Sequence, residues 1–86
     1  MTEDEKRALG HVAAGALLFH NGLWGGPMGF LWSDERGSAA GRVPEWESTA
    51  LTLLERRGLV SIRACLGTRD LPVVVTDAGV RVLRTR

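Results

Sequence analysis

The sequence predicts one small α+β domain that spans residues 1–86. Two stretches support this prediction. In LLERRGLVSI, residues 53–62, a leucine-spaced helix pattern stops at Arg-Arg-Gly and a short apolar strand pattern follows. In VVVTDAGVRVL, residues 73–83, a β-branched strand leads into a Thr-Asp helix start. The composition, with 44% hydrophobic and 24% charged residues, is typical of a globular protein rather than a disordered one.

The first helix is expected over residues 3–20. Thr2 and Glu5 have the spacing of a capping box, and the acidic residues around them suit the positive end of a helix dipole. An apolar stripe then recurs at helical spacing, at Leu9, Val12, Ala13, Ala16 and Leu17. Gly22 is expected to stop this helix.

A glycine-rich stretch, NGLWGGPMG at residues 21–29, follows the first helix. It does not resemble a phosphate-binding loop, because no Gly-Lys-Ser/Thr comes after it and no apolar strand comes before it. We interpret it as a connecting loop in which Pro27 begins the next element.

That next element is expected to be a second helix over residues 27–36, with Phe30, Leu31 and Trp32 turned inward. Because Gly, Phe and Trp are middling to poor helix formers, a short strand at residues 29–33 is the alternative. The small and polar segment GSAAGRV, residues 37–43, is expected to form a turn.

A third helix is expected over residues 44–57. Pro44 suits its first position, and Glu45 and Glu47 suit its positive first turn. The sequence Arg56-Arg57-Gly58 places cations and a glycine where a helix ends. The residues expected to face the core are Trp46, Ala50, Leu51, Leu53 and Leu54.

The segment 59–76 predicts a β-hairpin. Leu59–Leu66 alternates apolar and polar residues, Gly67–Asp70 supplies turn residues, and Pro72–Thr76 gives a second strand. Thr76 or Asp77 is expected to cap a final helix over residues 77–86. Its inward residues are expected to be Ala78, Val82 and Leu83.

This order of elements resembles the winged helix-turn-helix DNA-binding domains of the MarR and PadR regulator families. Those domains commonly show a leucine-spaced recognition helix that closes in a basic pair plus Gly-Leu-Val, then a wing, then Leu-Thr-x-x-Gly before the last helix. The matching residues here are Leu51, Leu54, Arg56–Val60 and Val75–Gly79, with Val75 in place of the usual leucine. The match is best over residues 44–86. The resemblance implies a small winged helix-turn-helix with three helices, a two-stranded β-wing and a short C-terminal helix.

The resemblance also implies a transcriptional regulator that binds double-stranded DNA. Helix 44–57 would then be the recognition helix in the major groove, and hairpin 59–76 would be the wing. Short hydroxyls can contact phosphates or bases, and arginine suits guanine or phosphate. The candidate DNA contacts are Arg42, Ser48, Thr49, Thr52, Arg56, Arg63 and Arg69.

The charge distribution gives this hypothesis only partial support. Residues 1–47 hold four Lys or Arg and seven Asp or Glu, a net charge of −3, whereas residues 48–86 hold seven and three, a net charge of +4. A basic half favours an anionic partner. However, Glu45 and Glu47 lie at the end of the recognition helix that usually points toward DNA. A homodimer, usual in the families resembled, would double the contact surface.

The alternative function is a winged helix that docks on a protein partner, as an adaptor, co-regulator or inhibitor, without binding DNA. Aromatic and methionine side chains beside the glycine-rich loop would anchor such an interface. The candidate residues are Trp24, Met28, Phe30 and Trp32.

The sequence gives no sign of an enzyme, a metal site or a cofactor. No nucleophile lies in a recognisable motif, and the carboxylates fall at helix starts, where capping explains them. His11 and His20 have no second ligand at helical spacing, and Cys65 is expected to be a free thiol.

The sequence also predicts a cytoplasmic location and no membrane contact. The start, MTEDEKR, does not have the pattern of a secretory signal. The apolar run 12–19 is too short to span a bilayer.

Overall fold

The computed structural model describes residues 1–20, 28–63 and 70–84. In these residues the chain forms three helices and five strands, and all strand pairs are antiparallel. In chain order the elements are α1 (Glu3–Ala13), β1 (Leu17–His20), β2 (Gly29–Ser33), β3 (Ala39–Arg42), α2 (Glu45–Arg56), β4 (Val60–Ile62), β5 (Asp70–Val75) and α3 (Asp77–Arg84). The prediction of a small α+β fold is confirmed. The two-stranded β-wing is wrong as a description of the sheet, because three further strands extend it.

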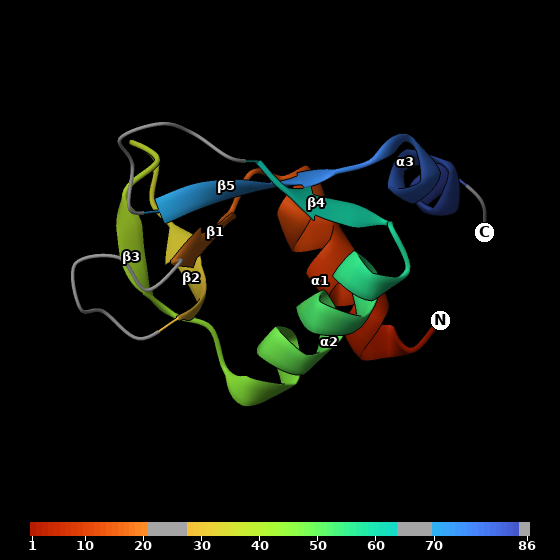
Figure 1. The fold of residues 1–86 in the computed structure, drawn as a ribbon, viewed down its shortest axis with the longest axis horizontal. Helices are drawn as coiled ribbons and strands as arrows, with labels where there is room; N and C mark the ends of the chain where they lie inside the picture. The colour runs from red at the N-terminus through yellow and green to blue at the C-terminus, as the bar shows by residue number, and fades with distance from the viewer. Residues whose placement is uncertain (21–27, 64–69, 85–86) are drawn as a thin grey trace.

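The sheet has the strand order β3-β2-β1-β5-β4. Helices α1 and α2 pack together beside it, and α3 lies at the end of the molecule that also holds both termini (Figure 1). Among the described residues, no helix is long and apolar enough to cross a membrane.

The core lies between the sheet and the helix pair α1–α2. It takes Leu9 and Val12 from α1, Leu51 and Leu54 from α2, and Leu17, Phe30 and Val73 from the sheet. In the sheet, Leu17 lies opposite Trp32, and Phe19 lies opposite both Phe30 and Leu71. The rings of Phe19 and Phe30 meet edge to face with their centroids 5.1 Å apart.

Helix α1 begins as predicted but ends earlier. The Thr2–Glu5 capping box is present. The helix stops at Ala13, not at residue 20, because Gly15 takes a left-handed conformation with φ +73°. The Gly15 N–H then donates to the Val12 carbonyl, and the Ala16 N–H donates to the His11 carbonyl, which is the Schellman pattern of a helix end. Residues 17–20 are therefore free to form β1.

The predicted second helix over residues 27–36 is wrong, and the alternative strand at 29–33 is correct. The aromatic residues Phe30 and Trp32 alternate along β2 and face the same side as Leu17 and Phe19 across the β1–β2 pair. Residues 37–43, expected to be a turn, contain β3.

The turn between β2 and β3 depends on Asp34. Its carboxylate accepts from the backbone N–H groups of Arg36 and Ser38, both at 2.9 Å. The Asp34 carbonyl accepts from the Gly37 N–H, where φ is +82°. Such a side-chain turn offers the backbone an alternative to helical bonds.

The C-terminal half agrees closely with prediction. α2 ends in a second Schellman pattern, with Gly58 at φ +73°. Strands β4 and β5 pair as a hairpin, and residues 64–69, which include the expected turn, lie outside the described chain. Thr76 caps α3, since its hydroxyl accepts from the Gly79 N–H at 3.1 Å.

Glycine at position 79 lets α3 approach the end of α2 closely. A Cβ atom built there would lie 2.1 Å from the Leu59 carbonyl oxygen and 2.6 Å from a Val75 methyl group. Thr76 adds two hydrogen bonds to the same place, from its hydroxyl to the Gly58 carbonyl at 2.6 Å and from its N–H to the Leu59 carbonyl at 3.1 Å.

Candidate nucleic-acid interface

The outer face of α2 gathers the side chains that sequence reasoning selected on this helix. Ser48, Thr49, Thr52 and Arg56 line one shallow hollow of about 280 Å³ together with Leu53. Thr49, Thr52 and Arg56 are exposed, and Ser48 is partly exposed. This set follows from helical spacing, because 48, 52 and 56 share one side of the helix and 49 and 53 flank it.

The opposite face of α2 fixes the orientation of this hollow. Ala50, Leu51 and Leu54 are almost fully buried in the core. Leu53, which we expected to face inward, is 39% exposed and belongs to the outer face. The outer face therefore combines hydroxyls, one leucine and one guanidinium with two exposed carboxylates, Glu45 and Glu55.

Glu47 does not lie on this face. Its side chain is fully buried, and Oε1 lies 2.7 Å from His11 Nδ1 on α1. The His11 ring in turn meets Trp32 edge to face, with centroids 5.2 Å apart. Of the two carboxylates expected at the front of the helix, only Glu45 is exposed. Glu47 therefore adds no exposed carboxylate to the front of α2, where Glu45 remains.

Arg57 is also taken away from the outer face. Its guanidinium lies 2.8 Å from Oε2 of Glu5 on α1. The backbone N–H of Thr2, burial, the Thr2 hydroxyl and the charge of Arg57 all act on this carboxyl, and the net result is a lowered pKa of Glu5. Of the two arginines at the end of α2, Arg56 is therefore exposed to solvent, whereas Arg57 is paired with Glu5 on α1.

The remaining predicted DNA contacts do not lie on α2. Arg42 is on β3 and Arg63 directly follows β4, and these strands are the two opposite edges of the sheet. Both residues are exposed, and the Arg42 side chain lies over Gly29. Arg69 lies outside the described residues. The structure thus brings four of the seven candidates together.

The residues selected for a protein interface are dispersed. Met28 is 67% exposed, whereas Phe30 is 7% exposed and belongs to the core. Trp32 is partly buried and packs against the core. Trp24 lies outside the described residues.

Two histidines have acidic partners that the sequence did not reveal. Besides His11 with Glu47, Nδ1 of His20 lies 3.0 Å from Oδ1 of Asp70, across the β1–β5 pair. Neither partner is near its histidine in sequence, so helical spacing could not identify the pairs. Within the described parts of the chain, no group of three or more His, Cys, Asp or Glu side chains could hold a metal ion. Cys65 falls outside those parts.

Comparison of the chain with protein-family models, with curated proteins and with solved structures finds no significant match in any of the three.

Proposed function

We propose that this protein binds duplex DNA through the outer face of α2 and acts in transcriptional control. The observation that carries the proposal is the single exposed surface formed by Ser48, Thr49, Thr52 and Arg56. An α-helix fits the major groove, where hydroxyl and guanidinium groups can reach base edges and phosphates.

The burial of Glu47 supports this proposal. An exposed carboxylate near phosphate oxygens is repulsive, and burial against His11 removes one of the two that the sequence places at the start of α2. Thr52 also remains able to accept a hydrogen bond, since its hydroxyl donates to the Ser48 carbonyl at 2.9 Å.

The order of elements gives further support over the C-terminal half. Helix α2, the hairpin β4–β5 and the Thr-capped α3 follow one another as in the winged-helix resemblance. The hairpin β2–β3 takes the place of the second helix. In this proposal the protein is a winged-helix variant in which α2 reaches DNA without a preceding helix of the helix-turn-helix pair.

The test is binding of the whole chain to random duplex DNA at two salt concentrations, measured by fluorescence anisotropy. We expect weak binding that falls with salt, with a shallow slope because few cations face outward with α2. Arg56→Ala should weaken binding by about 1–3 kcal/mol if Arg56 contacts a guanine.

A matched control is Arg36→Ala, because Arg36 is exposed on the β2–β3 turn, away from α2. It should leave affinity unchanged. Equal losses in both variants would point to a general charge effect and reject the site. No binding at low salt would reject the proposed function and favour docking on a protein.

A further inference from the structure

The two histidines of the described chain are each paired with a carboxyl group, and the pairs differ in how far the second ring nitrogen is covered. Nδ1 of His11 lies 2.7 Å from Oε1 of Glu47, and Nδ1 of His20 lies 3.0 Å from Oδ1 of Asp70. In His20 the second nitrogen, Nε2, is buried and has no hydrogen-bond partner. The His11 side chain is 41% exposed, against 13% for His20. His11 is therefore the histidine that a solute can reach.

The surroundings of His11 hold its ring in one orientation. Glu47 is fully buried, so the Nδ1 side of the ring faces the interior. The Trp32 ring meets the imidazole edge to face, with centroids 5.2 Å apart and an angle of 76° between the rings. The exposed part of the ring is therefore the edge away from Glu47, where Nε2 lies. A group fixed in this way is oriented before a reaction begins.

The carboxyl group of Glu47 prepares Nε2 as a nucleophile. When Nδ1–H donates to Oε1, the lone pair of the neutral imidazole is on Nε2. A new bond at Nε2 gives the ring a positive charge, and a carboxylate on the Nδ1 proton stabilises that charge. Oε2 of Glu47 has no hydrogen-bond partner among the described residues, so the bond seen for this carboxyl group is the one to His11. The pair has the arrangement of an activated nucleophile.

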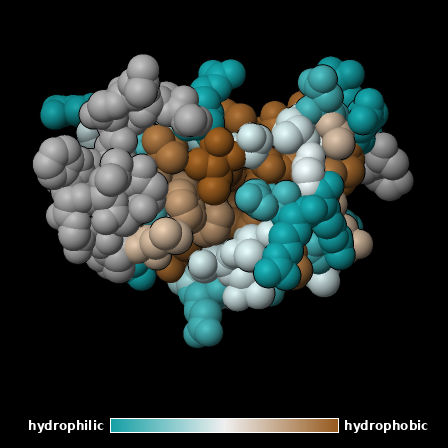
Figure 2. All heavy atoms as spheres, viewed as in Figure 1, coloured by the Kyte–Doolittle hydropathy of each residue, from teal (hydrophilic) through white to brown (hydrophobic). Residues whose placement is uncertain are grey.

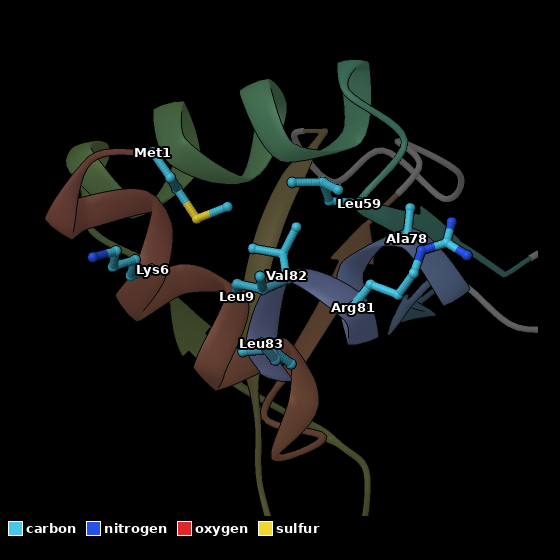
Figure 3. A pocket seen from close by; sticks show the side chains of 8 residues that line it. All are labelled: Met1, Lys6, Leu9, Leu59, Ala78, Arg81, Val82 and Leu83. Carbon is cyan, nitrogen blue, oxygen red and sulfur yellow. The ribbon is translucent and has the colours of Figure 1, made fainter. Parts of the chain in front are cut away.

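The opposite side of α1 faces an apolar hollow instead. Lys6 and Leu9 lie five and two positions before His11, which places them on the far side of the helix. They line a hollow of about 880 Å³ between α1 and α3 (Figure 3). Leu83 on α3, which was expected to face inward, also lines it and is 41% exposed.

This hollow offers no nucleophile like His11. None of the eight described side chains labelled in Figure 3 carries an imidazole, hydroxyl, thiol or carboxyl group. The charged ends of Lys6 and Arg81 point away from its middle in opposite directions. In Figure 2 hydrophobic and strongly hydrophilic residues lie next to one another over α3. The reactive group lies across α1 from this hollow.

We propose that His11 is a phosphoryl-acceptor site, at which Nε2 takes a phosphoryl group from a small donor with a good leaving group. The Nε2 lone pair forms the new N–P bond while the bond from phosphorus to the leaving group breaks, and the leaving group departs with that electron pair. The Nδ1 proton stays between the ring and Glu47, where it offsets the positive charge of the ring. A phosphoryl group carries a charge of about −1.5 to −2, which the solvent at the exposed edge of the ring can stabilise.

The modification would act at the start of α2. Glu47 lies in the first turn of this helix, directly before Ser48 and Thr49 of the outer face. A phosphoryl group on His11, its partner, adds negative charge beside that turn. A resulting loss of DNA affinity rests on the proposed function, whereas the reactivity of His11 does not.

The first experiment treats the whole folded chain with phosphoramidate, a small phosphoryl donor whose leaving group is ammonia. Mass spectrometry counts and locates the phosphoryl groups, and the rate is compared with that of N-acetylhistidine, a free imidazole. We expect one group per chain, on His11, gained faster than by N-acetylhistidine. His11→Gln should lose this reaction, whereas His20→Gln, the matched control, should keep it. A rate no higher than that of N-acetylhistidine, or modification of His20 in place of His11, overturns the proposal.

The second experiment tests Glu47 as a positioning residue. Glu47→Gln keeps an oxygen that can accept from Nδ1 but removes the charge, and should slow the reaction about tenfold, the difference between a charged and a neutral hydrogen bond. Nitrogen NMR of His11 reports which ring nitrogen carries the proton, a signature that packing alone does not set. We expect the proton on Nδ1. A Glu47→Gln variant that reacts as fast as wild type, or a wild-type proton on Nε2, overturns the role of Glu47.

Thermal unfolding shows whether each variant remains folded. If His11→Gln or Glu47→Gln fails to fold, phosphorus NMR of the modified wild-type chain takes its place, because it distinguishes a phosphoryl group on Nε2 from one on Nδ1. Attachment at Nδ1 overturns the proposal. These measurements contain no DNA, so their outcome is separate from that of the proposed function. DNA affinity before and after modification tests the link to α2, and an unchanged affinity rejects that link.

Discussion

The two buried carboxylates of the α1–α2 contact are held in different ways. Glu5, on α1, is 2% exposed. Its Oε1 accepts from the Thr2 N–H at 3.2 Å and from the Thr2 hydroxyl at 3.1 Å. Its Oε2 lies 2.8 Å from the Arg57 guanidinium. Glu47, on α2, is fully buried, and its Oε1 lies 2.7 Å from His11. Its Oε2 has no hydrogen-bond partner among the described residues.

The two pairs run in opposite directions across the same pair of helices. At one end α1 supplies the acid and α2 the base, and at the other end the roles are exchanged. Both pairs favour an antiparallel arrangement of α1 and α2, because each joins the start of one helix to the end of the other. The difference in partners implies that Glu5 can lose one partner and keep others, whereas Glu47 depends on His11 alone among the interactions seen.

His11→Ala is expected to give the largest effect on this contact. It removes the hydrogen-bond partner of a fully buried carboxyl group and the ring contact to Trp32. The free energy of unfolding should fall by about 2–3 kcal/mol, because a buried polar group left without its partner is costly. The measurement is urea unfolding at neutral pH.

The control for His11→Ala is the double variant with Glu47→Leu. Replacement of the buried carboxylate by an apolar side chain should recover most of the loss. A double variant as unstable as His11→Ala would mean that packing of the imidazole, and not its pairing with Glu47, carries the effect.

Glu5→Gln is expected to have an intermediate effect that depends on pH. The lowered pKa of Glu5 means that its ionised form stabilises the fold. This stabilisation is complete at pH values above the ordinary pKa of 4.5, and it is lost as pH falls through the lower pKa of the folded state. At neutral pH the variant should lose about 1–2 kcal/mol. Unfolding measured from neutral to acidic pH should show wild type and variant converging below 4.5, the ordinary pKa of the carboxyl. A constant difference would contradict the pKa assignment.

Arg57→Ala is expected to have the smallest effect. The Arg57 side chain is 52% exposed, so solvent screens its ion pair, and Glu5 keeps both bonds to Thr2. We expect a loss of less than about 1 kcal/mol in the same urea assay. A loss as large as that of His11→Ala would show that the two ends of the helix pair are not as different as their hydrogen bonds indicate.

The parts of the fold that were predictable are those with strong local signals. Arg-Arg-Gly at 56–58 and the Thr76 cap fix the end of α2 and the start of α3 from nearby residues alone. The same Schellman pattern at Gly15 was missed because Leu17 continues the helical spacing of α1 past its end. β2 could be named only as an alternative, since its aromatic residues are placed by pairing with β1, which local spacing does not reveal.

The candidate interface shows the same limit. The outer set on α2 follows from helical periodicity, so Ser48, Thr52 and Arg56 were predictable. The inward turn of Glu47 and Arg57 was not, because their partners, His11 and Glu5, lie on α1, far away in sequence. Fixed spacing on one helix identifies which residues share a face, but not which charges another helix neutralises.

Thr76 caps α3 and also donates two hydrogen bonds to the segment that ends α2. Gly58 and Leu59 close α2 with their N–H groups, and their carbonyls accept from the hydroxyl and the N–H of Thr76, while Gly79 keeps α3 close to the Leu59 carbonyl. The start of α3 is therefore bonded directly to the residues that end α2, and Thr76 makes both bonds. A larger side chain at position 79 would push α3 away from the Leu59 carbonyl and so disturb the end of α2 as well.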